Sequence, residues 1–428
     1  MKILFVYPNI TKQTTPQVGI ASILALIAPK HQTMFFDLSV ISPGNEYKAY
    51  LETFYQFKPD VVMVSCRTNE WGYVKKLIEL SYPTPVIVGG IHPTVAVDEV
   101  LAYSKIAVIG EAEGMIEELL DKMQRGRDIS AIPNVCTKKG GKVIKNDVMP
   151  LIQDLDELPI PLWNAFNPRH FQQSYIRNLF PDITCVGTFE TTRGCPYACT
   201  YCCNYYLHGL YKGKGKYHRR KSPKRVINEI KEFKDLYPDC NFVYFVDDTF
   251  MVSQEWLEKF ADIYDKTPFV FMTRAEMVTV DKMKLIADMG GKAVSIGIES
   301  GNEKFRREVY ERQMSNEQII NAFKTAKDFG LATYSFNMVG APYETKDDIQ
   351  LTINLNKRIR PDIAQFTTFY PLPGTKLFDI CKKEGFLNGK YPEVFSYYDK
   401  SFLNMPNLTS EEIDKWKKKA EKECNPKK

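Results

Sequence analysis

The stretch ETTRGCPYACTYCC, residues 190–203, holds four of the ten cysteines of this 428-residue chain. Cys195, Cys199 and Cys202 follow the spacing CxxxCxxC, and Cys203 comes directly after them. In a reducing compartment, clustered cysteines are more often metal ligands or catalysts than disulfides. The stretch therefore predicts a metal centre. The number of cysteines and the sequence around them indicate its kind.

Composition describes an ordinary globular protein. With 428 residues, 44% of them hydrophobic, the chain is long enough for two or three domains with a sizeable core. The net charge of +5 is small for this length and does not indicate a nucleic acid or a membrane as partner. The apolar run GIASILALIA is too short to span a bilayer, and the opening MKILFVYP lacks a cleavage site of small residues. We expect a cytoplasmic protein with reduced thiols.

Short β-branched runs alternate with helical stretches in the first third of the chain. This pattern is typical of a parallel sheet that is buried on both faces. We therefore predict a doubly wound, Rossmann-like α/β domain over residues 1–145. Its strands are expected at residues 3–8, 33–39, 60–66, 84–90 and 106–114.

Ligands of such sheets bind outside the carboxyl ends of the strands. There, Gly89 and Gly90 would let the backbone approach a ligand closely, although two glycines can also be a simple turn. The first strand is not followed by GxGxxG, so a nicotinamide or flavin cofactor is a weak hypothesis.

A second series of strands and amphipathic helices begins near residue 184. Six strands are expected at residues 188–194, 241–248, 269–276, 293–300, 333–340 and 363–371. Six strands predict a partial (β/α)6 barrel, open on one side, over residues 184–385. The carboxyl ends of barrel strands form the active face, and the cysteine stretch follows the first of them.

Three close cysteines are one ligand short of a structural zinc site, which usually takes two spaced pairs. They are also one short of filling a 4Fe-4S cluster, so one iron would stay open to a substrate or cofactor. CxxxCxxC after a strand, with Tyr201 before the last cysteine, resembles the signature of the radical S-adenosylmethionine (SAM) enzymes. This resemblance implies that Cys195, Cys199 and Cys202 bind an oxygen-sensitive 4Fe-4S cluster, with Cys203 as a packed neighbour.

The resemblance covers nearly the whole chain. FVDDTF, TRAEMV, SIGIESG, MVGAPYET and FYPLPGT look like successive barrel segments of that superfamily, and VGGIHPT with GEAEG looks like its cobalamin-binding domain. The implied cofactors are a 4Fe-4S cluster, SAM and cobalamin, and the implied partner is an electron donor such as flavodoxin or ferredoxin. Neither a nucleic acid nor a membrane is expected to bind.

Several polar residues at barrel strand ends are candidates for SAM. Arg274 would bind the carboxylate, because a guanidinium matches it with two hydrogen bonds. Ser295 and Glu299 lie four residues apart, which predicts one face of a strand and a role at the ribose or the amino group. Asp247 and Asp248 alternate, so at most one of them faces the cofactor. The predicted set is Tyr201, Asp248, Arg274, Ser295, Glu299 and Asn337; the alternative for each is a structural contact at the barrel mouth.

The candidates for cobalamin lie at the strand ends of the first domain. They are Asn9, Thr68, Asn69, Gly89, Gly90, His92, Thr94, Gly110 and Glu111. Many cobalamin domains carry an Asp-x-His-x-x-Gly motif whose histidine binds cobalt from below. None of the five histidines here has Asp two positions before it, so we expect a lower face without that ligand.

The remaining segments complete the domain prediction. Residues 146–183 read as a Pro-punctuated linker, and residues 386–428 as a C-terminal helical region whose last helix starts with a Thr409-x-x-Glu412 capping box. The run at residues 211–225 holds eight Lys or Arg, which would suit an anionic substrate. We favour a solvated loop before a helix that is capped by Ser222 and opens with Pro223.

The resemblance implies a cobalamin-dependent radical SAM methyltransferase, which passes a methyl group to an unactivated carbon after a deoxyadenosyl radical has removed a hydrogen atom. With the same cofactors, cyclisation, ring contraction or oxidation is the alternative. A metal-bearing binding module without turnover is a third hypothesis. A methylthiotransferase is disfavoured, because it needs three N-terminal cysteines and residues 1–150 contain only Cys66 and Cys136. Neither the substrate nor a catalytic side chain can be assigned from the sequence.

Overall fold

The computed structural model describes residues 1–172, 175–387 and 391–425. The chain forms two compact units. The first contains residues 1–182, 206–217 and 393–395, and the second contains residues 183–205, 218–392 and 396–428. We had predicted a linker over residues 146–183; the structure groups residues up to Asp182 with the first unit. Helix α8 (Cys203–Leu210) contributes residues to both units.

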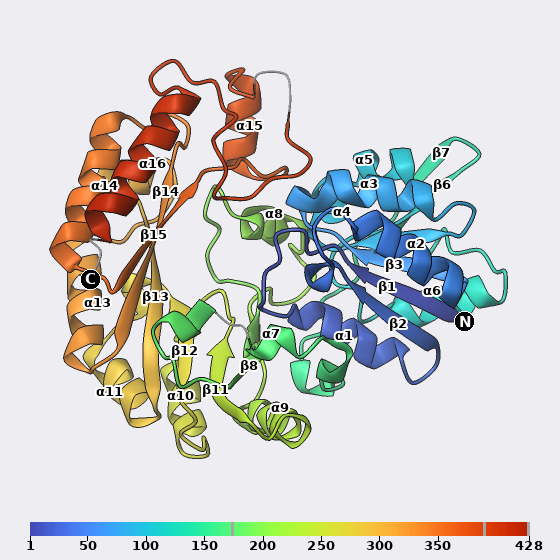
Figure 1. The fold of residues 1–428 in the computed structure, drawn as a ribbon, viewed down its shortest axis with the longest axis horizontal. Coiled ribbons are helices and arrows are strands. Elements are labelled where there is room, and N and C mark those ends of the chain that lie inside the picture. Colours follow the sequence, from blue (N-terminus) through green and yellow to red (C-terminus); the bar gives the residue numbers. More distant parts are fainter. Residues whose placement is uncertain (173–174, 388–390, 426–428) are drawn as a thin grey trace. The chain divides into compact units, whose positions relative to one another are not determined.

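The first unit is built on a seven-stranded sheet with the order β2-β1-β3-β4-β5-β6-β7. The chain steps from β1 outward to β2 and then reverses to β3 on the other side of β1. Because parallel crossovers are right-handed, this reversal places helices on both faces. α1 and α6 cover one face, and α2 to α5 cover the other (Figure 1). The strands are β1 (Lys2–Tyr7), β2 (Gln32–Asp37), β3 (Val61–Ser65), β4 (Val86–Gly89), β5 (Ile106–Val108), β6 (Val135–Lys139) and β7 (Lys142–Lys145); the helices are α1 (Val18–Ile27), α2 (Glu46–Phe57), α3 (Trp71–Leu80), α4 (Ile91–Val95), α5 (Val97–Tyr103), α6 (Ile116–Gln124) and α7 (Arg169–Gln172).

The five predicted strands of this sheet are present and parallel. The antiparallel hairpin of β6 and β7 was not predicted. Its signal is in the sequence, because Gly140 and Gly141 separate two alternating runs, and two such glycines suit a tight turn. Both residues have positive φ angles.

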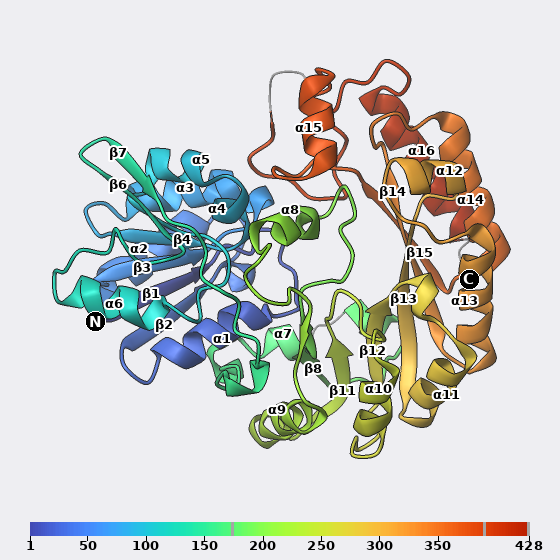
Figure 2. The same ribbon diagram turned by 180° about the vertical axis from the view of Figure 1, so that it is seen from behind.

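The second unit is a six-stranded, all-parallel sheet with the order β15-β14-β13-β12-β11-β8. β8 and β15 stay unpaired with each other, so the sheet is a partial barrel, as predicted. Figure 2 shows most of its helices packed on the outside of the curved sheet. The strands are β8 (Cys185–Phe189), β11 (Cys240–Phe245), β12 (Phe269–Thr273), β13 (Gly291–Glu299), β14 (Ala332–Val339) and β15 (Ile363–Thr368); the helices are α9 (Pro223–Leu236), α10 (Gln254–Ala261), α11 (Val280–Asp288), α12 (Glu303–Glu308), α13 (Asn316–Asp328), α14 (Lys346–Ile359), α15 (Lys376–Lys383) and α16 (Ser410–Cys424).

Short elements fill the connections. β9 (Thr192–Arg193) and β10 (Arg219–Arg220) form a small antiparallel pair next to the cysteine stretch. Single turns of 3₁₀ helix occur at Leu38–Val40, Thr68–Glu70, Leu155–Glu157, Trp163–Ala165, Tyr175–Asn178 and Ala275–Met277. None of the helices in the described part of the chain has the length and apolar character that a membrane crossing demands.

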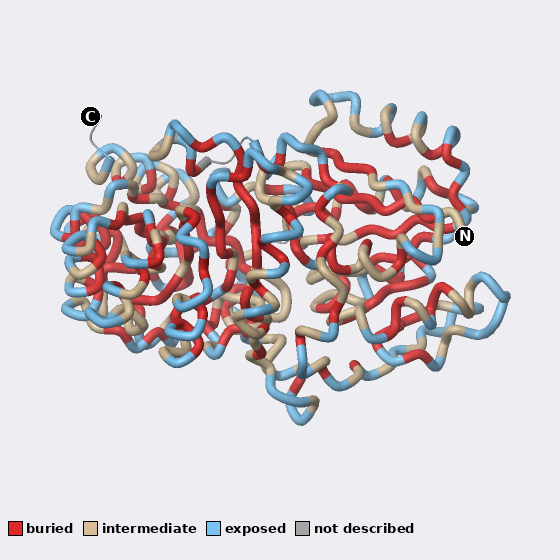
Figure 3. Tube along the Cα trace, turned by 90° about the horizontal axis from the view of Figure 1, so that it is seen from below, coloured by how far each residue is buried: buried red, intermediate tan, exposed pale blue. Residues whose placement is uncertain are grey.

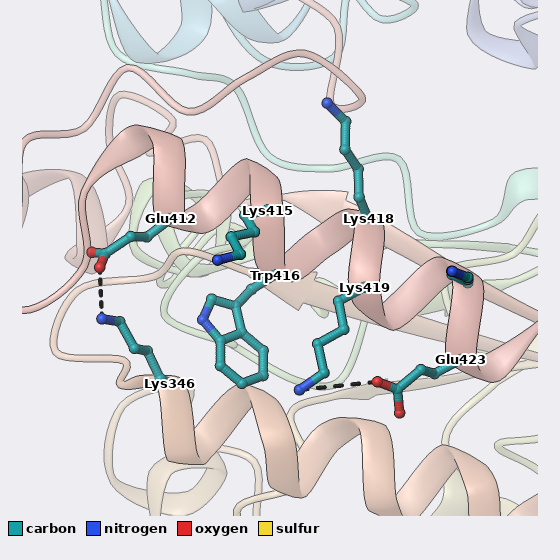
Figure 4. Close-up of a pocket in the computed structure, with 8 residues that line it drawn as sticks. Lys346, Glu412, Lys415, Trp416, Lys418, Lys419 and Glu423 are labelled. Atoms are coloured by element: carbon teal, nitrogen blue, oxygen red, sulfur yellow. Dashed lines mark ion pairs between the residues drawn. The ribbon is translucent and has the colours of Figure 1, made fainter.

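Each unit has its own apolar core, formed by the strands and the inner faces of the helices (Figure 3). In the first, Leu4 and Val64 of the sheet pack with Trp71 of α3. In the second, Phe366 of β15 packs with Ile353 of α14 and Ile413 of α16.

Both predicted helix caps are present. Ser222 accepts a hydrogen bond from the Arg225 backbone N–H at 3.1 Å, and Pro223 is the first residue of α9. Thr409 and Glu412 form the capping box of α16.

The basic run before α9 is less solvated than we predicted. Lys221 is buried and forms an ion pair of 2.9 Å with the buried Glu229. The guanidinium of Arg220 lies over the ring of Trp256, 4.9 Å from its centroid. Our prediction of a solvated loop was wrong for this end of the run, because buried carboxylate and aromatic partners on α9 and α10 hold its side chains.

We predict that Arg306 of α12 is a main determinant of stability in the second unit. It is fully buried and donates hydrogen bonds to the carbonyls of Ser300 and Met314 and to Asn316. Arg306→Ala would leave these buried acceptors unpaired and should cost about 3 kcal/mol or more, lowering the midpoint of thermal unfolding by several degrees. The neighbouring Arg307 is half exposed, so Arg307→Ala is a matched control that should change the midpoint little. Equal midpoints for the two variants would contradict this assignment.

Candidate active site

The cysteine motif lies in the segment between β9 and α8. Cys195 and Cys199 are buried, and Cys202 is half-buried. The Cys195 Sγ lies 3.8 Å from the Thr249 hydroxyl, and the Cys202 Sγ accepts a hydrogen bond from the Asn204 amide at 3.5 Å. Cys203 is the first residue of α8 and hydrogen-bonds to Cys202, and this contact raises the pKa of the Cys202 thiol.

Nowhere in the described residues do three His, Cys, Asp or Glu side chains converge as a single metal ion would require. A 4Fe-4S cluster makes a different demand, since each cysteine bonds to a different iron. The three motif cysteines are free thiols and are one fewer than the four ligands of a structural zinc site, so the donor set fits a cluster with one open iron better than a zinc ion.

Two buried arginines converge on Cys199. Arg274 donates to its sulfur at 3.3 Å, and Arg312 lies 3.8 Å from the same atom. Both guanidiniums come from segments that follow barrel strands, Arg274 after β12 and Arg312 beyond β13 and α12. Two positive charges beside one sulfur would compensate the negative charge of a cluster bound there.

Arg274 is already engaged by a carboxylate. Its guanidinium forms an ion pair of 2.7 Å with Glu276 and stacks on Tyr197, 3.7 Å from the ring centroid. For Arg274 to bind the carboxylate of SAM, as we predicted, Glu276 would have to give up this contact.

Glu299 and Tyr201 lie beside Arg312, a residue that the sequence alone does not mark as functional. Arg312 donates to the Tyr201 hydroxyl at 3.1 Å and to the Gly297 carbonyl at 2.7 Å, and lies 3.9 Å from Glu299. Its Nε is buried without a partner among the described residues. Burial raises the pKa of the Glu299 carboxyl, although Arg312 opposes this effect. No local pattern marks Arg312, because its partners come from distant parts of the chain.

Glu299 has a left-handed backbone with φ of +67°, which is costly for a residue other than glycine. The pairing of β13 with β14 shifts register between Gly297 and Glu299. We had placed Ser295 and Glu299 on one face from their spacing alone. The shift removes the regular alternation on which that inference rested, and Ser295 stays buried within β13.

The two aspartates after β11 behave differently. Asp247 is buried and accepts hydrogen bonds from the Thr191 backbone and from the hydroxyls of Thr191 and Thr192, so its role is structural. Asp248 is exposed and accepts a hydrogen bond from Asn204 at 3.0 Å. Of the pair, Asp248 is the one available to a ligand.

Asn337 does not join this group. Its amide donates to Ser335 and to the Gln365 carbonyl, and its oxygen accepts from Asn356 of α14 at 2.8 Å. These contacts connect β14 to β15 and to α14. None of them supports the predicted contact of Asn337 with SAM, which stays a prediction.

At the carboxyl edge of the first sheet, Gly90 and Thr94 shape the loop after β4. Gly90 has φ of +99°, and a Cβ there would lie 2.8 Å from the Cys66 carbonyl oxygen. The Thr94 hydroxyl donates to the Gly90 carbonyl at 2.8 Å and accepts from the Gly110 N–H at 2.9 Å. Gly90 is therefore required by the fold itself, whereas a Cβ on Gly89 would touch only Val108, at 4.0 Å.

Gly110 and Glu111 follow β5 and contact Tyr211. The Tyr211 hydroxyl accepts a hydrogen bond from the Glu111 N–H at 2.7 Å, and a Cβ on Gly110 would collide with that hydroxyl. A cavity of about 520 Å³ opens beside these loops, lined among others by Thr94, Ile109 and Tyr206.

The other predicted cobalamin residues are buried near the same edge. Asn9 is hydrogen-bonded to the backbone of Gln13, and Asn69 donates to the Phe395 carbonyl at 3.1 Å. Thr68 begins the 3₁₀ turn after β3. His92 packs on Trp71, and burial lowers its pKa to about 4, so the imidazole is neutral at neutral pH. No hydrogen bond to its ring nitrogens exists among the described residues.

Two family models match the chain. Residues 11–120 match the B12 binding domain, and residues 189–355 match the Radical SAM superfamily. The chain is 27% identical to an uncharacterized methyltransferase of Pyrococcus horikoshii over 98% of this chain and 91% of that protein. It is 22% identical to the anaerobic magnesium-protoporphyrin IX monomethyl ester cyclase of Rubrivivax gelatinosus over 97% of this chain and 75% of that protein.

Its fold is similar to that of the radical SAM methyltransferase TsrM from Kitasatospora setae, solved with cobalamin and a [4Fe-4S] cluster. The TM-score is 0.70 at 16% identity, over 90% of this chain and 75% of that one. The architecture confirms the predicted fold class, and the two matched models confirm the predicted cofactors, a 4Fe-4S cluster, SAM and cobalamin. They also exclude the third hypothesis, a binding module without turnover. The chain belongs to the radical SAM enzymes that carry a cobalamin-binding domain before the barrel.

Proposed function

We propose that the enzyme transfers a methyl group from cobalamin to an unactivated carbon of its substrate. The observation that carries the proposal is the combination, on one chain, of a B12-binding domain with a barrel in which two buried arginines reach Cys199 of the cysteine motif. The similarity to an uncharacterized methyltransferase over almost the whole of both chains supports methylation.

The residues of the barrel suit the cluster in this reaction. Cys195, Cys199 and Cys202 would hold it, and the absence of a fourth cysteine from the motif leaves one iron for SAM. When bound, the cluster supplies one electron for the cleavage of SAM, and cobalamin carries the methyl group. Arg274 and Arg312 compensate negative charge at Cys199, in a buried setting where such contacts are stronger than in water.

Polar groups near the motif are suited to orient SAM. Glu299 is held by Arg312, and its backbone is strained in the manner of many functional residues. Asp248 is exposed and fixed by Asn204, so its second oxygen can accept hydrogen bonds from the ribose or the amino group. An electron donor such as flavodoxin or ferredoxin would complete the system.

A radical reaction without methyl transfer is the second candidate. The similarity to a cyclase, at 22% identity over 97% of this chain, favours it. Cyclisation, ring contraction or oxidation would use the same cofactors, so the two candidates differ in products and not in the site.

The products distinguish the candidates. Methyl transfer consumes two SAM molecules for each methyl group and releases S-adenosylhomocysteine together with deoxyadenosine. The assay uses SAM that is labelled in its methyl group. We expect S-adenosylhomocysteine and deoxyadenosine in equal amounts, and we expect the label in the methylated substrate. Deoxyadenosine without S-adenosylhomocysteine would favour the second candidate and refute methylation.

The ligands of the cluster can be tested by comparing neighbouring thiols. Cys199→Ala should abolish both cluster binding and deoxyadenosine formation after anaerobic reconstitution, because the remaining motif cysteines are too few to hold the cluster. Cys203→Ala is the matched control and should retain about four iron per chain, the content of one cluster. Iron analysis and visible absorbance measure both. If Cys203→Ala loses the iron and Cys199→Ala keeps it, the ligand set is wrong.

The cobalamin edge can be tested at Gly89, since the structure shows that a side chain on Gly90 would strain the fold itself. Gly89→Leu should lower the cobalamin bound per chain without changing iron content, because its bulk would fill the space over the strand end. Gly19→Leu is the control, because Gly19 lies exposed on α1 with open space around it. Unchanged cobalamin binding in Gly89→Leu would contradict the predicted edge.

The SAM contacts can be tested at Arg274. Arg274→Ala should leave bound cobalamin unchanged and lower deoxyadenosine formation more than tenfold, since losing a charge-assisted contact costs roughly 2 kcal/mol. Comparison with Gly89→Leu tests whether the two cofactors use separate sets of residues. If both variants remain folded and both lose bound cobalamin and deoxyadenosine formation, the two cofactors do not use separate sets of residues.

A further inference from the structure

Two cysteines outside the motif stand directly side by side. Cys185 is the first residue of β8 and Cys240 the first of β11, and the two are register partners in neighbouring parallel strands. Neighbouring strands lie about 4.8 Å apart, which is within the Cα separations of roughly 4.4–6.8 Å that disulfides span. Register partners in parallel strands also point their side chains to the same face of the sheet.

The residues around the pair hold it in place. The Thr184 hydroxyl donates to the Asp239 carbonyl at 2.7 Å, and the Asn241 side chain accepts from the Thr184 N–H at 3.0 Å. These bonds join the segments before and after the two cysteines. The regular pairing is then interrupted by an irregularity between Cys240 and Phe242. The two thiols are therefore fixed next to each other at the amino ends of their strands.

The surroundings shift the pKa values of the two thiols in opposite directions. A hydrogen bond between them lowers the pKa of Cys240 and raises that of Cys185, and the nearby Lys234 also favours the Cys240 thiolate. Both side chains are largely buried, with 4% exposed for Cys185 and 7% for Cys240. β8 is an edge strand, so local opening of the sheet at this end needs the loss of pairing on one side only.

We propose that Cys185 and Cys240 form a reversible dithiol–disulfide site that reacts with low-molecular-weight disulfides. The Cys240 thiolate attacks one sulfur of such a disulfide, forms a mixed disulfide and expels a thiolate. The Cys185 thiol then releases its proton and attacks the Cys240 sulfur, which forms the Cys185–Cys240 bond and expels the second thiolate. Two cysteine sulfurs are oxidised by two electrons, and one small disulfide is reduced to two thiols, which take up the two protons.

The site is distinct from the cluster motif. The motif follows the carboxyl end of β8, whereas Cys185 begins that strand. Neither thiol contacts a motif cysteine in the hydrogen bonds and charge contacts of the pair. The proposal does not depend on which reaction the enzyme catalyses.

The test treats the cluster-loaded protein with oxidised glutathione under anaerobic conditions, followed by alkylation, trypsin and mass spectrometry. The sequence suits the experiment, because residues 178–193 and 235–259 form tryptic peptides with one cysteine each. We expect these two peptides linked by a disulfide that dithiothreitol reverses. The linked form should exceed glutathione adducts at the buried Cys66 and Cys136 by about tenfold, since the second thiol acts at high effective concentration.

Variants separate the two steps. Cys185→Ala should trap glutathione on Cys240, while Cys381→Ala, which removes another buried thiol of the barrel unit, should leave the linked peptide unchanged. A stable glutathione adduct on wild-type Cys240 without the link, or no reaction of either thiol, would overturn the proposal. An adduct on Cys185 in Cys240→Ala, with none on Cys240 in Cys185→Ala, would overturn the assigned order of attack. If an alanine variant does not fold, the linked peptide from the wild-type protein still tests whether the disulfide forms.

Discussion

The barrel mouth depends on the two buried guanidiniums beside Cys199. A buried cation is costly unless an anion or several acceptors surround it. Arg274 is balanced by Glu276, and Arg312 by the Glu299 carboxylate, the Gly297 carbonyl and the Tyr201 hydroxyl. Both cations lie beside the Cys199 sulfur, at 3.3 Å for Arg274 and 3.8 Å for Arg312. A thiolate that carries an iron–sulfur cluster is the partner that this arrangement suits best.

The irregular end of β13 can be understood from the same constraint. Glu299 lies 3.9 Å from Arg312 at the point where the strand shifts register after Gly297 and the backbone of Glu299 turns into the left-handed region. Such a conformation costs roughly 1–3 kcal/mol and persists only where the surroundings determine it. The buried charge of Arg312 is one such determinant, because Glu299 is the carboxylate that pairs with it.

Sequence periodicity was sufficient for the regular parts of the fold and insufficient for the irregular ones. The parallel strands of both sheets were predictable because buried parallel strands are continuous apolar runs. The hairpin of β6 and β7 was missed although Gly140 and Gly141 mark its turn. Arg312 and the register shift before Glu299 were out of reach, because both arise from contacts between distant segments. Burial of Lys221 was missed for a different reason: its partner Glu229 lies in α9 and looks like an ordinary surface residue in the sequence.

The two glycines after β4 show how a motif can mix structural and functional demands. Gly90 is fixed by the fold, since its φ is positive and the backbone of Cys66 leaves no room for a Cβ. Gly89 has an ordinary backbone, and a Cβ there would meet only Val108, at an ordinary contact distance of 4.0 Å, so nothing in the described structure requires a glycine there. A residue without a side chain at such a position is explained most simply by an approaching ligand. If cobalamin approaches this edge closely, as we propose, Gly89 is the residue that would make room for it, whereas Gly90 serves the shape of the loop.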